Sequence, residues 1–336
     1  MSSLIYSMPR VTQIAILLSV LSPLIQGVSV GDVFDVKQGT TKGGCDGKNI
    51  DAWFADAITL GNSAAAGAAA TDQDSRKYLK TFFSIGPQDD ATQAGGPIGQ
   101  VNDVLNQRSL PPGGTPRLFC NSDWLQEQQW DDVAFDPATR LPRTDGKKVQ
   151  DVFVKDTTGK LFPFWSDDLR QYLKAETGDY CSDKDNLAAT QDQTAPSTIT
   201  LCIDNFSSNQ AETLANIPTV TTQKVSVSTL QVHSLNLFHE MFHLVLGTAG
   251  TPDHSYNLNS IVRFGTVKAI QNPESYTFYA LAYFLGQNTQ LTFANSKSAN
   301  KPPPANPKRS IESIHNDALE KFQMDKKGMP RGVWVA

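Results

Sequence analysis

Residues 239–243 read His-Glu-Met-Phe-His and lie inside an apolar segment that runs from 235 to 246. The segment predicts a buried helix that ends near Gly247, because glycine is common just past helix C-termini. Residues four apart lie on one face of a helix, so His239 and His243 can offer ring nitrogens to one metal ion. Glu240 lies on a neighbouring face, where it can accept a proton from a water held at the ion. This pattern is typical of zinc sites that hydrolyse peptide bonds.

A chance pair of histidines is the alternative interpretation. The chain has five histidines, and four of them fall between positions 233 and 254. This clustering in a histidine-poor chain favours a metal site. His233 lies off the face of the helix that carries the motif, and we interpret it as a surface or core histidine whose polar atoms are satisfied.

A catalytic zinc site uses three protein ligands and keeps one position open. Candidates for the third ligand lie just downstream, where residues 250–256 read Gly-Thr-Pro-Asp-His-Ser-Tyr. The carboxylate of Asp253 and the imidazole of His254 are both suitable zinc ligands, so the residue types alone leave both open. Glu274 could also approach the metal, or it could complement the dipole of a helix N-terminus.

The order His-Glu-x-x-His, then Gly-Thr-x-Asp-x-x-Tyr, resembles the aspzincins, the deuterolysin and peptidyl-Lys metalloendopeptidase family of secreted fungal enzymes. Residues 272–280, Asn-Pro-Glu-Ser-Tyr-Thr-Phe-Tyr-Ala, are similar to a third stretch of that family. The resemblance is sharp over 235–286 and thin before it. It implies a zincin-like α+β fold that is predominantly helical with a small sheet. It also implies one Zn²⁺ ion held by His239, His243 and Asp253.

The resemblance assigns further roles within the site. Glu240 would act as the general base and Tyr256 would donate a hydrogen bond to the oxyanion; a purely packing role is the alternative for Tyr256. Glu274 stands where Lys-preferring members carry an aspartate that helps to bind the residue after the scissile bond. The resemblance therefore implies a substrate-binding role for Glu274 and a basic preference at that position.

Two departures from the family pattern keep a second function open. Asn257 stands where the family usually has glycine, and Glu274 is longer than the family's aspartate. With the long insertions before the motif, these departures could reshape the cleft. The alternative is a secreted zinc-binding or surface antigen and interaction protein on the same fold with little proteolytic activity.

The N-terminus predicts secretion. An apolar run over 14–25 is interrupted by Pro23 and is followed by small residues near Ser29. This run is too short for a membrane span. We expect a signal peptide over 1–29, with an N-terminal membrane anchor as the alternative. The formal net charge of −5 disfavours nucleic acids and anionic membranes as partners. We therefore expect a secreted, extracellular monomer that acts on proteins or peptides and has no membrane contact after signal cleavage.

The remaining chain is expected to hold one catalytic domain over 30–288 with loop insertions, followed by a Pro-rich linker and tail over 289–336. Four cysteines in a secreted chain favour two disulfides, and sequence alone allows three pairings. The aspzincin resemblance implies the pairs Cys45–Cys120 and Cys181–Cys202. The sequon at Asn205 is consistent with secretion.

Local patterns predict the secondary structure around the site. Apolar spacing predicts helices over 49–70, 74–85, 101–108, 258–271 and 274–285. Alternating or β-branched residues predict strands over 117–120, 149–155 and 198–204. Segments 87–97, 131–148 and 183–196 are interpreted as loops. The aromatic cluster at 162–165 is interpreted as core packing, with a substrate-binding wall as the alternative.

Overall fold

The apolar segment that carries the His-Glu-x-x-His motif forms helix α6 (Ser234–Leu246), as the sequence predicts. The computed structural model describes residues 27–289 except 177, 222 and 224, together with 291 and 293. Every residue of α6 from 237 to 244 is buried, so this helix lies within the core. It ends at Gly247, whose φ of +85° is a left-handed value that glycine adopts without steric cost.

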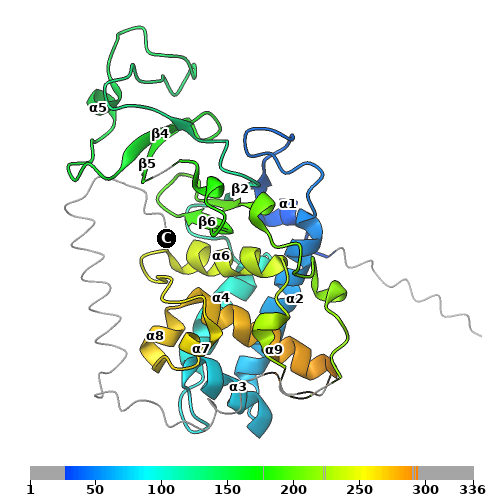
Figure 1. The fold of residues 1–336 in the computed structure, drawn as a ribbon. Helices are drawn as coiled ribbons and strands as arrows, with labels where there is room; N and C mark the ends of the chain where they lie inside the picture. The colour runs from blue at the N-terminus through cyan, green and yellow to red at the C-terminus, as the bar shows by residue number, and fades with distance from the viewer. Residues whose placement is uncertain are drawn as a thin grey trace, which may run out of the picture.

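Four longer helices pack around α6 or against one another. α2 (Ile50–Ala69) packs against α4 (Thr92–Leu105), against α6 and against α9 (Pro273–Thr289), while α3 (Gln73–Phe83) packs against α9 (Figure 1). Small residues of α2 allow this close approach: a Cβ on Gly67 would lie 2.7 Å from the Tyr279 hydroxyl. The Ala-rich part of α2 therefore serves helix packing.

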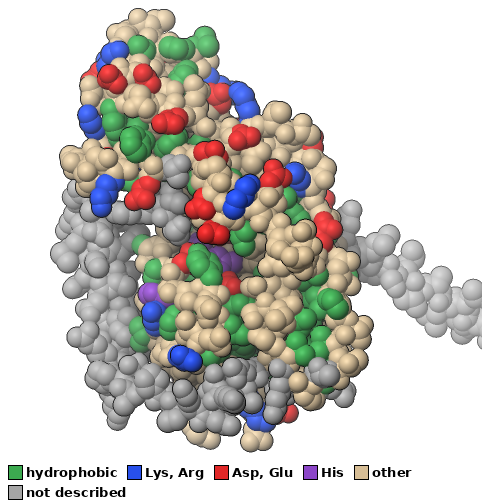
Figure 2. All heavy atoms as spheres, in the orientation of Figure 1, with side chains coloured by type: hydrophobic (Ala, Val, Ile, Leu, Met, Phe, Trp, Pro, Cys, Tyr) green, Lys and Arg blue, Asp and Glu red, His purple; other side chains and the backbone are tan. Residues whose placement is uncertain are grey.

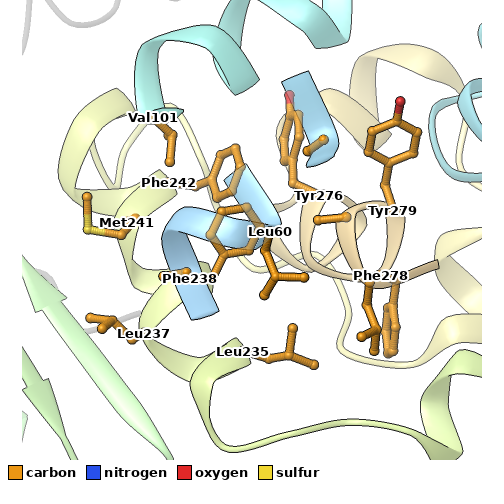
Figure 3. Packing of buried hydrophobic residues seen from close by; sticks show 14 of the residues in the cluster. Leu60, Val101, Leu235, Leu237, Phe238, Met241, Phe242, Tyr276, Phe278 and Tyr279 are labelled. Carbon is orange, nitrogen blue, oxygen red and sulfur yellow. The ribbon is translucent and has the colours of Figure 1, made fainter. Parts of the chain in front are cut away.

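Aromatic side chains join α6 to α9 in the core. The ring of Phe242 stacks on Tyr276 with centroids 4.4 Å apart, and Phe238 packs edge-on against Phe242 (Figure 3). All three are at most 1% exposed. Burial of each large apolar side chain stabilises the fold by about 1.5–3 kcal/mol. This packing fixes α6, the helix that bears the histidines, against α9.

A four-stranded sheet lies beside α6, in the order β1 (Asp35–Val36), β2 (Arg117–Phe119), β7 (Thr198–Leu201) and β6 (Ala188–Gln191). β1, β2 and β7 are parallel, and β6 pairs antiparallel to β7 at the edge of the sheet. The interpretation of 183–196 as a surface loop was wrong, because β6 lies within it and packs on α6. The strands expected at 117–120 and 198–204 are present as β2 and β7.

A second, three-stranded antiparallel sheet consists of β3 (Gln126–Glu127), β4 (Phe162–Ser166) and β5 (Gln171–Ala175). We call residues 126–175 the upper lobe, because they lie above the main sheet in Figure 1. Asp168 joins this lobe to the main sheet: its carboxylate accepts hydrogen bonds from Lys37 Nζ at 2.7 Å and from Arg117 at 3.1 Å. In β4, Phe164 and Trp165 are buried, as core packing of the aromatic cluster predicts, whereas Phe162 is 39% exposed.

Three other expectations from local pattern were wrong. Residues 149–152 form a short helix, α5 (Val149–Val152), where a strand was expected, because the Asp151 carboxylate accepts the Lys148 N–H at 2.8 Å and favours a helical turn. α4 begins at Thr92, inside an expected loop, where Asp90 accepts the Thr92 N–H at 2.9 Å. The expected helix over 258–271 is divided into α7 (Leu258–Ile261) and α8 (Thr266–Ile270).

Both disulfide pairs that the resemblance implied are confirmed. Cys45 pairs with Cys120 and Cys181 with Cys202, each with Cα atoms 5.1 Å apart. Two disulfides fit an extracellular protein. Within the described ranges no helix combines the length and apolar character that a membrane crossing requires. The first helix of the described residues is the short α1 (Val30–Val33). Nearly all of the expected signal peptide (1–29) and of the expected tail (289–336) lies outside the described residues.

The structure is therefore a mixed α+β fold with small sheets, as expected. The core extends from Val30 through α2, α6 and α9 to Phe293. α6 lies between this helical core on one side and the edge strand β6 on the other. The motif side chains are thus held at the junction of the helical layer and the sheet.

Candidate metal centre

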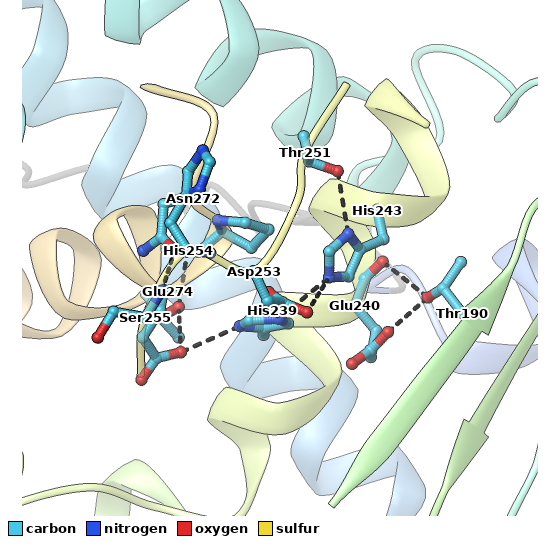
Figure 4. Close-up of polar contacts among 12 residues, drawn as sticks. Thr190, His239, Glu240, His243, Thr251, Asp253, His254, Ser255, Asn272 and Glu274 are labelled. Carbon is cyan, nitrogen blue, oxygen red and sulfur yellow. Dashed lines mark hydrogen bonds and ion pairs between the residues drawn. The ribbon is translucent and has the colours of Figure 1, made fainter. Parts of the chain in front are cut away.

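The two motif histidines face the same point. One turn of α6 separates His239 from His243, and their Nε2 atoms lie 3.2 Å apart (Figure 4). Both residues are buried, and with Glu240 they form a group whose candidate ligand atoms all lie within 4.8 Å of one another. Figure 2 shows histidine side chains inside a hollow of the surface, with acidic side chains along its border. This buried His-Glu-His group could hold a metal ion.

Asp253, in the loop that follows α6, brings its carboxylate close to both histidine rings. Its Oδ1 lies 3.1 Å from His239 Nε2 and its Oδ2 lies 3.3 Å from His243 Nε2. Around a tetrahedral zinc ion with bonds of about 2.0–2.1 Å, neighbouring ligand atoms lie about 3.3–3.4 Å apart. Oδ1 is buried, and His239 Nε2 is its close polar neighbour, so the carboxylate lies where it could share a metal ion with that ring. The three side chains therefore fit one zinc ion.

His254, the alternative third ligand, lies in a different environment. Its ring packs edge-on against Phe264, with centroids 6.2 Å apart, and its backbone N–H donates to Asn272 Oδ1 at 2.9 Å. The Asp253 carboxylate, in contrast, lies within 3.3 Å of both histidine Nε2 atoms. These positions favour Asp253 as the third ligand.

The second ring nitrogen of each histidine is held by a hydrogen-bond acceptor. Glu274 Oε2 lies 3.0 Å from His239 Nδ1, and Thr251 Oγ1 lies 2.9 Å from His243 Nδ1. The Thr251 hydroxyl donates to the Gly247 carbonyl at 2.8 Å, so its oxygen accepts the Nδ1 proton of His243. Both Nδ1 atoms therefore carry a proton, so it is the Nε2 atom of each ring that would bind a metal once it is unprotonated.

In the metal-free set, burial and neighbouring charges act in opposite directions on the pKa values of His239 and Asp253. Burial opposes protonation of His239, but the Asp253 and Glu274 carboxylates outweigh it and raise the pKa of His239. Burial likewise disfavours the charged form of Asp253, but hydrogen bonds from His239 and His243 lower its pKa. A metal ion that binds here must displace the proton on His239, so protons and metal compete for the same atoms.

Glu240 is positioned by a residue that the sequence interpretation missed. Its Oε2 accepts a hydrogen bond from Thr190 Oγ1 at 2.6 Å, and both residues are buried. Thr190 lies on β6, within the segment interpreted as a surface loop. Its β-branched side chain, next to buried Ala189, was the only local sign of a strand. This contact fixes the carboxylate beside the two histidines on a face where it can act as a base.

Asp192, just past β6, ties the sheet to the ligand loop. Its Oδ2 accepts the Thr248 N–H at 2.8 Å and its Oδ1 accepts the Thr248 hydroxyl at 3.0 Å. Thr248 follows the end of α6 and leads towards Asp253. The edge strand therefore contacts both the general-base candidate and the turn that leads to the third ligand.

Tyr256 lies against the site with one face open. Its ring stacks on His239 with centroids 5.6 Å apart and an interplanar angle of 25°, and the residue is 60% exposed. Loss of hydration at its hydroxyl and the nearby Asp253 carboxylate raise the pKa of Tyr256, so the hydroxyl keeps its proton. This position is compatible with both roles considered from the sequence, packing beside the site and donation to a bound ligand.

Glu274 lies behind His239, at the start of α9. Besides His239 Nδ1, its Oε2 accepts a hydrogen bond from Thr277 Oγ1 at 3.1 Å, and Gln231 Nε2 lies 3.5 Å from its Oε1. The residue is buried. These contacts favour a role in orienting His239, while the substrate-binding role stays a prediction.

The stretch 272–280 supports the ligand loop. Asn272 Oδ1 accepts the N–H groups of His254 and Ser255 at 2.9 and 3.1 Å. Its Nδ2 donates to Ser275 Oγ at 3.2 Å. The start of α9 thus holds the loop that carries Asp253. His233, in contrast, lies against Trp53 and bonds to a backbone carbonyl, as expected for a satisfied core or surface histidine.

Comparison with known proteins identified no relative. No family model, no curated protein and no solved structure matches this chain. The aspzincin resemblance therefore rests on the three short motifs.

Proposed function

We propose that this protein is a secreted, zinc-dependent endopeptidase of the aspzincin type with a zincin-like fold. One observation carries the proposal: the Nε2 atoms of His239 and His243 and the Asp253 carboxylate converge within 3.3 Å beside a buried Glu240. A structural zinc site needs no general base. A carboxylate that is held in place at the metal is the feature that hydrolysis requires.

The chain's own residues have separable tasks in this reaction. Zinc, when bound, supplies Lewis acidity and makes a water acidic near neutral pH. Glu240, held by Thr190, accepts a proton from the attacking water and passes it to the leaving amine. Tyr256, with one ring face on His239 and its hydroxyl protonated, donates a hydrogen bond to the oxyanion.

The edge of the main sheet supports a polypeptide substrate. β6 is the edge strand of the sheet, and the side chain of its Thr190 contacts the general base. Unpaired main-chain groups at a strand edge can bind an extended peptide by strand addition. The proposal includes no basic preference after the scissile bond, because the Glu274 carboxylate is already in contact with His239, Thr277 and Gln231.

The test compares zinc content with hydrolysis in three proteins: wild type, Glu240→Gln, and Glu212→Gln as a control at an exposed carboxylate. Casein and a broad panel of quenched fluorescent peptides serve as substrates. We expect one equivalent of zinc in all three, and hydrolysis that Glu240→Gln reduces by about 10²–10⁴-fold. A chelator should abolish hydrolysis in the other two.

Two outcomes contradict the proposal. Equal hydrolysis by wild type and Glu240→Gln would show that Glu240 is not the base. Zinc bound by all three proteins with no hydrolysis across the panel would favour the zinc-binding or interaction protein considered from the sequence.

A further inference from the structure

A second concave site lies between the upper lobe and the loop that follows β6. This cavity of about 320 Å³ is near the lower end of the range for ligand sites, about 300–1,000 Å³. It has room for one large side chain. Its apolar wall comes from the upper lobe, and its other wall comes from the loop residues Gln193, Thr194 and Ala195.

The apolar wall is aromatic and held in place. The rings of Phe135, Trp165, Tyr172 and Phe153 follow one another with centroid separations of 5.4, 5.0 and 5.7 Å. Their polar ends are occupied: the Tyr172 hydroxyl accepts the Phe135 N–H at 2.7 Å, and Trp165 Nε1 donates to Asp167 at 2.6 Å. Trp165 is fully buried behind the other three rings, so the half-buried Phe135, Phe153 and Tyr172 present the fixed apolar surface, which suits stacking with another aromatic group.

The cavity also carries positive charge. Arg143 is one lining residue, but its guanidinium is paired with Asp145 through hydrogen bonds of 3.0 and 2.7 Å. Arg170, also in the lining, is exposed and forms no hydrogen bond or ion pair with its side chain to any residue that the structure describes. One unpaired cation therefore borders an aromatic wall, which favours an anionic group on the ligand.

The cavity lies within reach of the proposed catalytic centre. Gln193 follows Thr190 by three residues, and an extended chain covers at most about 3.6 Å per residue. The two residues are therefore at most about 11 Å apart. Thr190 Oγ1 is itself 2.6 Å from Glu240. An extended substrate bound along β6 would reach the cavity three or four residues from the cleaved bond.

We propose that this cavity is a subsite for an aromatic substrate side chain that is followed by an acidic residue. The ring would stack on the half-buried rings of Tyr172 and Phe153, and the carboxylate would pair with Arg170. The proposal rests on the proposed function, because it places the ligand on a polypeptide bound along β6. It makes the upper lobe a specificity element of the protein.

Calorimetry on the zinc-loaded, full-length Glu240→Gln protein tests the subsite without turnover. One peptide carries Phe-Glu at the outer positions, and the others carry Ala-Glu or Phe-Gln. Val152→Trp would fill the cavity from its exposed rim, and Val154→Trp is the matched control at an exposed residue outside the lining. Arg170→Gln removes the cation, and Arg140→Gln is its control at another exposed arginine with positive φ.

We expect Val152→Trp to weaken binding of the Phe-Glu peptide about tenfold, and Val154→Trp to leave it unchanged. Arg170→Gln should weaken the Phe-Glu peptide by about two- to fivefold, leave the Phe-Gln peptide unaffected, and differ from Arg140→Gln. Equal affinity for all three peptides, or Val152→Trp and Arg170→Gln both matching their controls, would overturn the proposal. Because Arg170 is exposed, its variant remains informative even if Val152→Trp fails to fold.

The outcomes separate this proposal from the peptidase proposal. Selective binding of the Phe-Glu peptide without hydrolysis by wild type would support the cavity and contradict the peptidase. Hydrolysis by wild type with unselective binding would support the peptidase and overturn the subsite.

Discussion

Thr190 offers a sharp prediction, because its hydroxyl contacts the proposed general base, at the carboxylate Oε2 at 2.6 Å and at the backbone carbonyl at 3.3 Å. Thr190→Val keeps the shape of the side chain but removes the donor to Glu240 Oε2 at 2.6 Å. A hydrogen bond to a charged group contributes about 1.5–3 kcal/mol, and about 1.4 kcal/mol corresponds to a tenfold change in rate. If that contribution acts through the orientation of Glu240, kcat should fall by about 10–150-fold.

The assay measures kcat, KM and zinc content for wild type, Thr190→Val and Thr190→Ser. We expect Val to lower kcat with little change in KM or zinc content, since Thr190 contacts neither the proposed ligands nor a bound peptide through its hydroxyl. Ser retains the donor and should stay within a few-fold of wild type. A Val variant with wild-type kcat, or a Ser variant as impaired as Val, would refute the positioning role.

Three further predictions concern the metal and the fold. Glu274→Ala removes the acceptor of the His239 Nδ1 proton and should weaken zinc about 10–100-fold in a competition titration, whereas a purely substrate-binding role would leave zinc affinity unchanged. Burial raises the pKa of Asp56, so the native protein binds the Asp56 proton more tightly than the unfolded chain does, and wild type loses stability as pH rises. In urea titrations the stability of Asp56→Asn relative to wild type should therefore increase between about pH 3 and pH 7. A difference in stability that stays constant over this range would contradict the argument. Gly67→Ala should lower the free energy of unfolding by about 1–3 kcal/mol through its clash with Tyr279, while Gly99→Ala, with open space around it in α4, should be neutral or stabilising; equal effects of the two would contradict the packing account.

The local sequence pattern was sufficient to predict the helix that carries the motif. The apolar spacing around His239 and His243 predicts one buried helix, and helix geometry alone places both rings on one face. The assignment of Asp253 as the third ligand came from the family motif, because the residue types alone left His254 as an equal candidate. The short distances from the Asp253 carboxylate to both histidine Nε2 atoms agree with that assignment. The disulfide pairing likewise came from the resemblance and is confirmed.

Non-local contacts explain what the sequence did not predict. β6 reads Ala-Ala-Thr-Gln, which has little intrinsic strand preference, and its conformation depends on pairing with β7 and packing on α6. Thr190 was therefore missed although it contacts Glu240. The orientation of Glu274 towards His239 also depends on how α9 packs beside α6, a distance of 35 residues along the chain.

The most direct test of the metal centre is anomalous diffraction at the zinc edge from crystals of the zinc-loaded protein. We predict one peak about 2.0–2.2 Å from His239 Nε2, His243 Nε2 and an Asp253 carboxylate oxygen, with the Glu240 carboxylate close to it but not bound. A peak at another position, coordination by His254 in place of Asp253, or no peak at all would contradict the account.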